Sequence, residues 1–341
     1  MYALYAALSP IGTSASEANT TGYENALSAY ASGDYANALI YGKLAGAGGH
    51  VKAQVLVGHI LLKGLSGTLD KKDVVGDKKD AAGWFKRAAN NGNTDAMVAL
   101  GELALAGQGG LSVQDAADWL TRAADNNRTD AMVALAEMYR LGKGVDIDLT
   151  KTKHWLRKAA NYGDNIAAYE LGNIHLERDP KQALIWYEQA ATQGEPQAAY
   201  AAAILYAENF NITPDAAKAA KLLKQAANAG LAAAQADYGL VVYQGNGTER
   251  SIVEAAQWFK KSAENGDAEG RFLYAFTLAK GEGVKQSFED AYYWLLLAEK
   301  TGSSGIDEYD QSRAELKKRL EDNVDPAILS QAKKRARLLS K

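Results

Sequence analysis

The chain of 341 residues contains no cysteine. This absence excludes disulfide bonds, thiolate nucleophiles and a lipid-bearing cysteine, and it is compatible with an oxidising compartment without demonstrating one. No apolar stretch reaches the roughly 18 residues of a membrane-spanning helix. Charges of both signs are nearly balanced, with 38 basic and 41 acidic residues and a net charge of −3. The sequence therefore carries no electrostatic footprint for binding nucleic acid.

Groups that could carry chemistry are also scarce. The four histidines do not stand at a metal-binding spacing, and no phosphate-binding glycine loop is present, so we predict no metal, no cofactor and no catalytic residue. Ser330 to Lys333 matches the S-x-x-K pattern and Lys300 to Gly302 matches K-T-G, as in β-lactamases. Their order is reversed relative to those enzymes and S-D-N is missing, so a β-lactamase-like hydrolase remains only a remote alternative.

The tryptophans are few but periodic. Successive gaps of 35, 36, 31, 72 and 36 residues separate them, and Leu222 stands at the vacant position inside the double gap. A period near 36 residues is typical of a solenoid of stacked helix pairs. The six residues in this register are Trp84, Trp119, Trp155, Trp186, Trp258 and Trp294.

Other columns repeat in phase with tryptophan. A small residue four positions later allows the next helix to approach closely. A glycine eight positions later suits the positive φ that ends a helix, and Asn127 is its one substitute. A Gly or Ala column lies inside the following helix, where a recurring glycine indicates a contact too tight for a methyl group. The members of this last column are Gly101, Ala136, Gly172, Ala203, Gly239 and Ala275.

Only five prolines occur, and four of them follow Asp, Glu or Thr, as in Asp179-Pro180. Proline behind a capping residue is typical of a helix start. No alternating β-branched run indicates a strand. The sequence therefore predicts an all-α fold.

The repeat also predicts how the chain is divided. Residues 1–21 form a lead, residues 22–49 an atypical helix pair, residues 50–302 the solenoid, and residues 303–341 a helical cap. A charged insertion at 64–79 is predicted to be an exposed loop. Expected helices in the terminal segments are 23–31, 35–47, 306–320 and 326–339.

The lead resembles a secretory signal in part. Tyr2 to Leu8 is a short apolar run, and small residues follow around Ser14. The first basic residue is Lys43, so the charged leading region of a signal is missing. Export to the periplasm or secretion is our expectation, and a cytoplasmic location is the alternative.

A family resemblance rests on these motifs. Residues 131–163 contain Ala-Met-Val-Ala-Leu-Ala-Glu-Met-Tyr, then Gly142-Lys143-Gly144-Val145 and Trp155, and residues 275–302 repeat the pattern. The chain resembles the bacterial, exported subgroup of Sel1-like repeat proteins, relatives of the tetratricopeptide repeat. The resemblance implies a right-handed α-solenoid whose concave groove binds a protein, in a non-enzymatic adaptor such as a periplasmic regulator of envelope or exopolysaccharide signalling. The cysteine-rich, penicillin-binding type of this family does not fit a chain without cysteine.

By similarity to tetratricopeptide geometry, the concave groove is formed by the first helix of each repeat. Tyrosine and arginine suit such a surface because they combine apolar area with a polar tip. An alternative is that the tyrosines pack within the solenoid, and a glycan or peptidoglycan is the alternative partner. The predicted partner-binding residues are Glu102, Glu137, Arg140, Tyr169, Asn173, Tyr200, Tyr243, Gln244 and Phe272.

Overall fold

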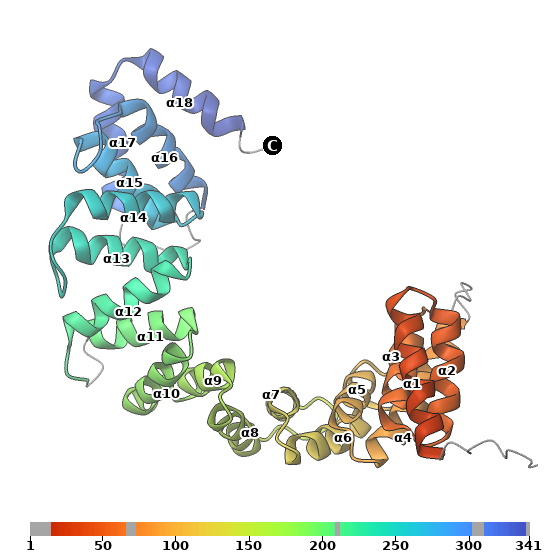
Figure 1. Cartoon of the computed structure of the whole chain (residues 1–341). Helices are drawn as coiled ribbons and strands as arrows, with labels where there is room; N and C mark the ends of the chain where they lie inside the picture. Colours follow the sequence, from red (N-terminus) through yellow and green to blue (C-terminus); the bar gives the residue numbers. More distant parts are fainter. Residues whose placement is uncertain (1–14, 66–72, 209–211, 302–309, 339–341) are drawn as a thin grey trace, which may run out of the picture. The chain divides into compact units, whose positions relative to one another are not determined.

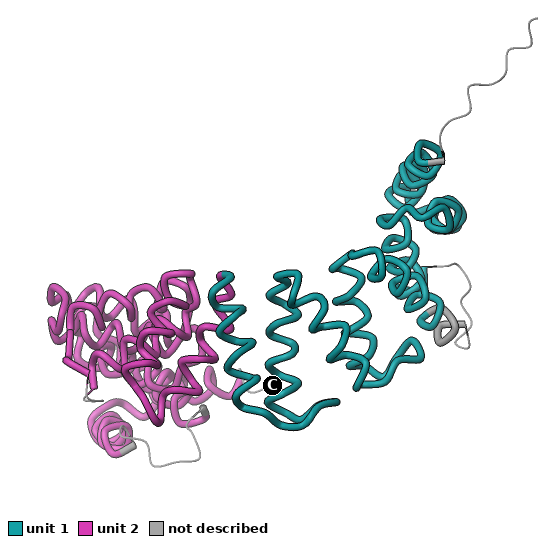
Figure 2. The backbone as a smooth tube through the Cα atoms, turned by 90° about the horizontal axis from the view of Figure 1, so that it is seen from below, with its two compact units in different colours: residues 1–162 teal, residues 163–341 magenta. Residues whose placement is uncertain are grey.

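The computed structural model describes residues 15–65, 73–208, 212–301 and 310–338. These residues form eighteen helices and no strand (Figure 1). The predicted all-α solenoid is confirmed. Two compact units make up the chain, residues 1–162 and residues 163–341, and Figure 2 colours them separately.

The helices follow one another in pairs. The chain opens with α1 (Ala15–Ala31) and α2 (Tyr35–Ala47), and it closes with α17 (Asp310–Asn323) and α18 (Pro326–Leu338). Between them, the first helices of the repeats are α3 (Val51–Leu62), α5 (Thr94–Leu105), α7 (Thr129–Leu141), α9 (Asn165–Leu176), α11 (Pro196–Ala207), α13 (Ala232–Gln244) and α15 (Ala268–Lys280). The second helices are α4 (Asp73–Asn90), α6 (Val113–Asp125), α8 (Leu149–Asn161), α10 (Pro180–Thr192), α12 (Ala216–Asn228), α14 (Ile252–Glu264) and α16 (Phe288–Thr301).

Contacts between repeats distinguish two faces. Within the first unit α5 contacts α7, and within the second unit α9 contacts α11 and α13 contacts α15. Successive second helices make no comparable contact within either described unit. Because successive first helices approach one another more closely than successive second helices do, the first helices lie on the inside of the curvature of each unit. We call the surface formed by the first helices the inner face and that formed by the second helices the outer face.

Local chemistry explains where the helices begin and end. Asn93 caps α5 by accepting a 2.8 Å hydrogen bond from the backbone N–H of Ala96, and Asp164 caps α9 in the same way. Between α6 and α7 the chain turns at Asn127, the one residue other than glycine with a positive φ, 64°, in the described part of the chain. The prediction that Asn127 substitutes for the closing glycine is therefore confirmed.

Within a repeat, a small residue of the first helix packs against a large residue of the second helix. A Cβ added to Gly239 in α13 would lie 2.6 Å from the ring of Phe259 in α14. A Cβ on Gly172 in α9 would overlap the ring of Tyr187 in α10. The inferred contact too tight for a methyl group is confirmed at these positions. Where the larger partner is a leucine the fit is equally tight: a Cβ on Gly101 in α5 would lie 2.6 Å from the Leu120 side chain in α6.

The terminal segments differ from the predictions in extent. Helix α1 begins at Ala15 rather than Tyr23, and the Asn19 side chain holds this extra length by donating a 2.7 Å hydrogen bond to the carbonyl oxygen of Gly48. Helix α4 begins at Asp73, so the end of the predicted loop at 64–79 is helical and continues into the helix that carries Trp84. Residues 66–72 of that loop, the apolar run at 2–8 and the start of the predicted helix at 306 lie outside the described residues. Helices α17 and α18 match the predicted terminal pair within a few residues. None of the described helices is both long and apolar enough to cross a bilayer.

Candidate partner-binding face

In the first unit, the predicted residues lie on the exposed side of α5 and α7. Glu102 is exposed on α5, and Glu137 and Arg140 are exposed on α7. The Arg140 guanidinium donates to both carboxylate oxygens of Glu137, from Nε at 2.7 Å and from a terminal nitrogen at 2.6 Å. These bonds lower the pKa of the Glu137 carboxyl. Glu137 and Arg140 therefore present a fork-shaped ion pair rather than two independent charges.

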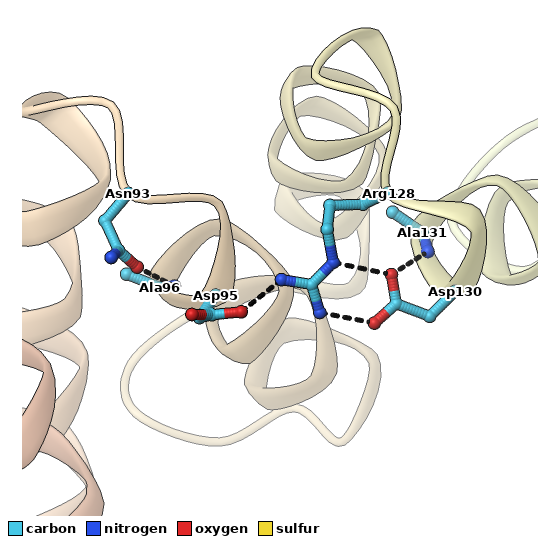
Figure 3. Close-up of polar contacts among 6 residues, drawn as sticks. All are labelled: Asn93, Asp95, Ala96, Arg128, Asp130 and Ala131. Atoms are coloured by element: carbon cyan, nitrogen blue, oxygen red, sulfur yellow. Dashed lines mark hydrogen bonds and ion pairs between the residues drawn. The ribbon is translucent and has the colours of Figure 1, made fainter.

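A second charged group in this unit connects two repeats. Arg128, at the start of α7, donates from Nε at 3.1 Å and from a terminal nitrogen at 2.6 Å to Asp130 (Figure 3). Its other terminal nitrogen pairs with Asp95 in α5 of the preceding repeat. Asp130 also accepts a 2.8 Å hydrogen bond from the backbone N–H of Ala131. The group was not predicted, because residues 33 apart in sequence meet only when the repeats stack.

In the second unit, Tyr169 and Asn173 meet through a residue of the second helix. The Tyr187 hydroxyl donates a 2.8 Å hydrogen bond to Oδ1 of Asn173, and the rings of Tyr169 and Tyr187 lie 5.7 Å apart. Burial raises the pKa of Tyr187 to about 12, so its hydroxyl is a donor at neutral pH. Asn173 remains exposed and the ring of Tyr169 is half-buried.

Tyr200 in α11 is held by the next repeat. Its hydroxyl lies near the carboxylate of Asp237 in α13 and interacts with it. Burial, together with the charge of Asp237, raises the pKa of Tyr200. The pKa of Asp237 is also raised, mainly by burial and further by the charge of Asp267, while the bond from Tyr200 opposes the shift. Asp237 was not among the predicted residues. The register of the repeat nevertheless places it on the inner face, one helical turn from the predicted positions.

Tyr243 at the end of α13 shows the same arrangement one repeat further on. Its hydroxyl donates a 2.6 Å hydrogen bond to Glu282, and Arg250 donates a 3.0 Å bond from Nε to its carbonyl oxygen. The neighbouring Gln244 is exposed. Tyr200 and Tyr243 thus connect repeats through their hydroxyls while their half-buried rings remain on the inner face.

The prediction for Phe272 is wrong. Its side chain is 5% exposed and packs 6.5 Å from the ring of Phe276, measured between ring centroids. A cleft of about 270 Å³ beside these rings is lined on its other side by Leu316 and Arg319 of α17. Helix α17 therefore lies beside α15 across this cleft. The sequence could not reveal this, because α17 lies outside the repeat and its docking position has no periodic signal.

A comparison with protein-family models identifies the repeat. The Sel1 repeat model matches residues 51–93, 94–127, 129–164, 161–195, 196–231, 232–267 and 268–303. The chain belongs to the Sel1-repeat family. Sel1-repeat proteins are generally protein-interaction scaffolds.

One solved structure shares this fold, and a second is less similar. A Sel1 repeat protein from Oxalobacter formigenes is similar with a TM-score of 0.67 and 24% identity, over 89% of this chain and 87% of that one. A protective antigen of uropathogenic Escherichia coli, described as displaying an SLR fold, is 23% identical over 93% of this chain and 83% of its own, with a TM-score of 0.47. No curated protein matches this Sel1-repeat protein in sequence.

The remaining candidate chemistry has structural explanations. His50 caps α3 by accepting a 3.2 Å hydrogen bond from the backbone N–H of Ala53, and the ring of His154 lies edge-on to Trp155 at 5.1 Å. Ser330 to Lys333 lies inside α18. Lys300 donates a 2.8 Å hydrogen bond to the carbonyl oxygen of Ala336 near the end of the same helix. Among the described residues, no group of three or more His, Cys, Asp or Glu side chains could hold a metal ion.

Proposed function

We propose that this Sel1-repeat protein is a non-enzymatic adaptor that holds a partner protein against the inner face of its second unit. The observation that carries the proposal is the anchoring of Tyr243, whose hydroxyl donates a 2.6 Å hydrogen bond to Glu282 of the next repeat. A ring held in this way loses little conformational freedom when a partner covers it, so contact with it costs less entropy. Tyrosine is also among the residues that contribute most to the free energy of binding at protein interfaces.

Exposed polar side chains adjoin the tyrosines and complete the surface. Asn173 stands beside Tyr169, and Gln244 stands beside Tyr243. Helices arranged in this way offer a groove for an extended or helical peptide. Glu102, Glu137 and Arg140 form the corresponding exposed surface of the first unit.

The compartment we propose is the bacterial periplasm, in envelope or exopolysaccharide signalling. The apolar run at 2–8 and the small residues after it support export. Fractionation of cells that express the full chain with a C-terminal tag tests this part separately. Recovery of the tag with cytoplasmic markers contradicts export without affecting the binding proposal.

The test of binding uses a photocrosslinking amino acid in living cells. It is placed at Asn173 or Gln244 on the inner face, and at exposed Gln257 of α14 on the outer face as the matched control. These positions are preferred to the tyrosines because loss of the Tyr200 or Tyr243 hydroxyl would also weaken contacts between repeats. We expect one protein to crosslink from both inner positions and not from Gln257.

Other outcomes of this experiment separate the alternatives. Crosslinking from Gln257 alone, or from no position, contradicts the inner-face adaptor. Recovery of glycan fragments without a protein favours the carbohydrate or peptidoglycan scaffold, in which the tyrosine rings stack on sugars.

A further inference from the structure

The second helix of the first pair presents a strongly exposed apolar side. In α2 the side chain of Ile40 is 61% exposed and that of Leu44 is 71% exposed. These two residues lie one helical turn apart, and exposed Ala36 and Ala47 continue the same side of the helix in both directions. We call Ala36, Ile40, Leu44 and Ala47 the α2 stripe.

The composition of α2 is that of a buried helix. Lys43 is its one charged residue. Helix α12, which also has 13 residues, carries Lys218, Lys221 and Lys224. A helix that is apolar on all sides is normally covered on all sides. Helix α2 packs against α1 and α3. Its remaining side therefore meets solvent without the polar side chains that α12 has.

The register of the repeat shows what this side of α2 would normally contact. Tyr41 precedes Gly49, which has a φ of +94°, by the eight residues that separate each tryptophan from the residue that closes its repeat. Tyr41 therefore stands at the tryptophan position. In the following repeat, Trp84 at this position lies against α2, with Cζ3 2.9 Å from where a Cβ on Gly46 would stand. Tyr41 thus points to where a preceding repeat would stack, and it is 38% exposed.

The polar contact that normally joins a repeat to the one before it is missing from α2. Three residues after the tryptophan position, Lys158 donates a 3.2 Å hydrogen bond to the carbonyl oxygen of Ala124 in the preceding repeat. Leu44 stands at this position in α2. A leucine has no donor for the carbonyl groups at the end of a preceding helix. This side of α2 therefore suits an apolar surface better than it suits another repeat.

The opposite end of the chain is already covered. Helix α18 packs against α16 and buries Leu329, Ala332 and Ala336. Lys300 of α16 donates a 2.8 Å hydrogen bond to the carbonyl oxygen of Ala336. Because α18 lies where a following repeat would stack, a second copy cannot continue the solenoid by placing its α2 on α16. The surface that remains for a second copy is α2 itself.

The α2 stripe is complementary to itself. Ala36 stands four residues before Ile40, and Leu44 stands four residues after it. In an antiparallel pair of α2 helices with a two-fold axis at Ile40, each Ile40 meets the other, and Ala36 of one copy meets Leu44 of its partner. The small side chain leaves room for the large one, and both copies use the same residues, as a two-fold interface requires. Tyr41 and Lys43 lie at the two edges of the stripe, where their polar ends stay in water.

We propose that the α2 stripe joins two copies of this chain, packed as an antiparallel pair of α2 helices around a two-fold axis. A helix of 13 residues is about 20 Å long, so the interface is small. The dimer is therefore reversible, with a dissociation constant on the order of 10–100 µM. The contact does not use the inner face of the second unit, so it is independent of the proposed function.

The first test measures the mass of the full chain by sedimentation equilibrium from about 1 to 500 µM. We expect the wild-type mass to rise from one chain towards two, and Ile40→Asp to weaken association at least about tenfold. Ile185→Asp is the matched control, because Ile185 is 56% exposed and directly precedes Trp186 as Ile40 precedes Tyr41. It should leave association unchanged. An unaltered helical circular-dichroism signal shows that both variants are folded.

The second test examines the two-fold geometry. Because the chain contains no cysteine, single cysteines report one contact each. Ile40→Cys should form a disulfide-linked dimer under mild oxidation, and Ile185→Cys should not. A mixture of Ala36→Cys and Leu44→Cys chains should crosslink to one another faster than either crosslinks to itself.

Three outcomes overturn the proposal. The first is a wild-type chain that stays monomeric over the whole concentration range, and the second is a dimer that Ile40→Asp leaves intact. The third is capture of a different protein in place of a second copy, by a photocrosslinking amino acid at Ile40 in living cells. Association that appears only after removal of residues 2–14 belongs with the first outcome, because the chain's own leading segment would then occupy the stripe.

Discussion

The side-chain amide of Gln225 donates a 2.6 Å hydrogen bond to the backbone carbonyl of Ala191 in the preceding repeat. Arg122 makes the equivalent bond to Ala89 at 3.2 Å, with its guanidinium 4.4 Å from the centre of the Trp119 ring. The carbonyl groups at the end of a helix have no partner inside that helix, and these side chains satisfy them. A long donor three residues after the tryptophan position therefore connects repeats whether or not the ring is present.

Loss of a tryptophan ring should lower the free energy of unfolding substantially. Trp155 is 9% exposed, and truncation of a large buried aromatic side chain costs about 3–5 kcal/mol. We expect Trp155→Ala to lower the urea midpoint of the helical circular-dichroism signal and to broaden the transition, since coupling between repeats weakens. Leu141→Ala, at a side chain that is 53% exposed, is the control and should change stability by less than about 0.5 kcal/mol. An unchanged midpoint for Trp155→Ala would contradict the place of tryptophan in the core.

The fit between Gly172 and Tyr187 predicts a coupled pair of substitutions. Gly172→Ala should destabilise the protein by about 1–3 kcal/mol, because the added methyl group overlaps the Tyr187 ring. Adding Tyr187→Leu should recover part of that loss, because leucine is smaller than tyrosine and can shift away from the added methyl group. A double-mutant cycle in urea should give a favourable coupling of about 1 kcal/mol or more.

Gly83 offers the matched control for that cycle. It is exposed in α4, and a Cβ there meets nothing within 4 Å. Gly83→Ala should therefore stabilise the helix by about 0.5–1 kcal/mol. Equal effects of alanine at Gly83 and Gly172 would mean that the contact with Tyr187 is not restrictive.

The raised pKa of Asp237 predicts that Asp237→Asn increases the stability of the protein by an amount that depends on pH. The ordinary pKa of aspartate is 3.8, and burial raises it in the folded protein, so the folded state binds more protons than the unfolded state between the two values. Stability from this group is complete below 3.8 and is lost as the pH rises through the folded pKa. Asp237→Asn should therefore stabilise the protein at pH 7, with a gain that vanishes as the pH falls towards the ordinary value. The free energy of unfolding of both proteins across this range checks the sign, and a gain that grows on acidification would refute it.

The ion pairs of Arg128 with Asp95 and Asp130 should contribute little to the stability of the protein, and their contribution should depend on salt concentration. Its side chain is 29% exposed, and those of Asp95 and Asp130 are 64% and 51% exposed. Solvent screening therefore limits the loss in Arg128→Ala to less than about 1 kcal/mol. We expect the difference in unfolding free energy to shrink between low salt and about 1 M salt, where the Debye length falls to about 3 Å. Arg128→Lys should recover only part, since an ammonium cannot bind two carboxylates as a fork.

The inner face was predictable in part. Repeat spacing correctly placed Glu102, Glu137, Arg140, Asn173 and Gln244 at exposed positions. The acceptors Asp237 and Glu282 were not predicted, because the partner of a tyrosine hydroxyl depends on which side chains of the next repeat lie within reach. Phe272 was predicted on the binding surface but is buried, and nothing periodic in the sequence marks where α17 lies beside it.

The sequence by itself determined the helix pairs of the repeat, the turns that close them and the family. These features depend on local chemistry, such as a capping Asn or Asp, a residue that tolerates positive φ and a tryptophan every 36 residues or so, and each recurs in phase. Only the tertiary structure decided which side chains remain open to a partner. That depends on how neighbouring repeats stack: Arg128 meets Asp95, Tyr200 meets Asp237, and Gln225 holds α12 to α10.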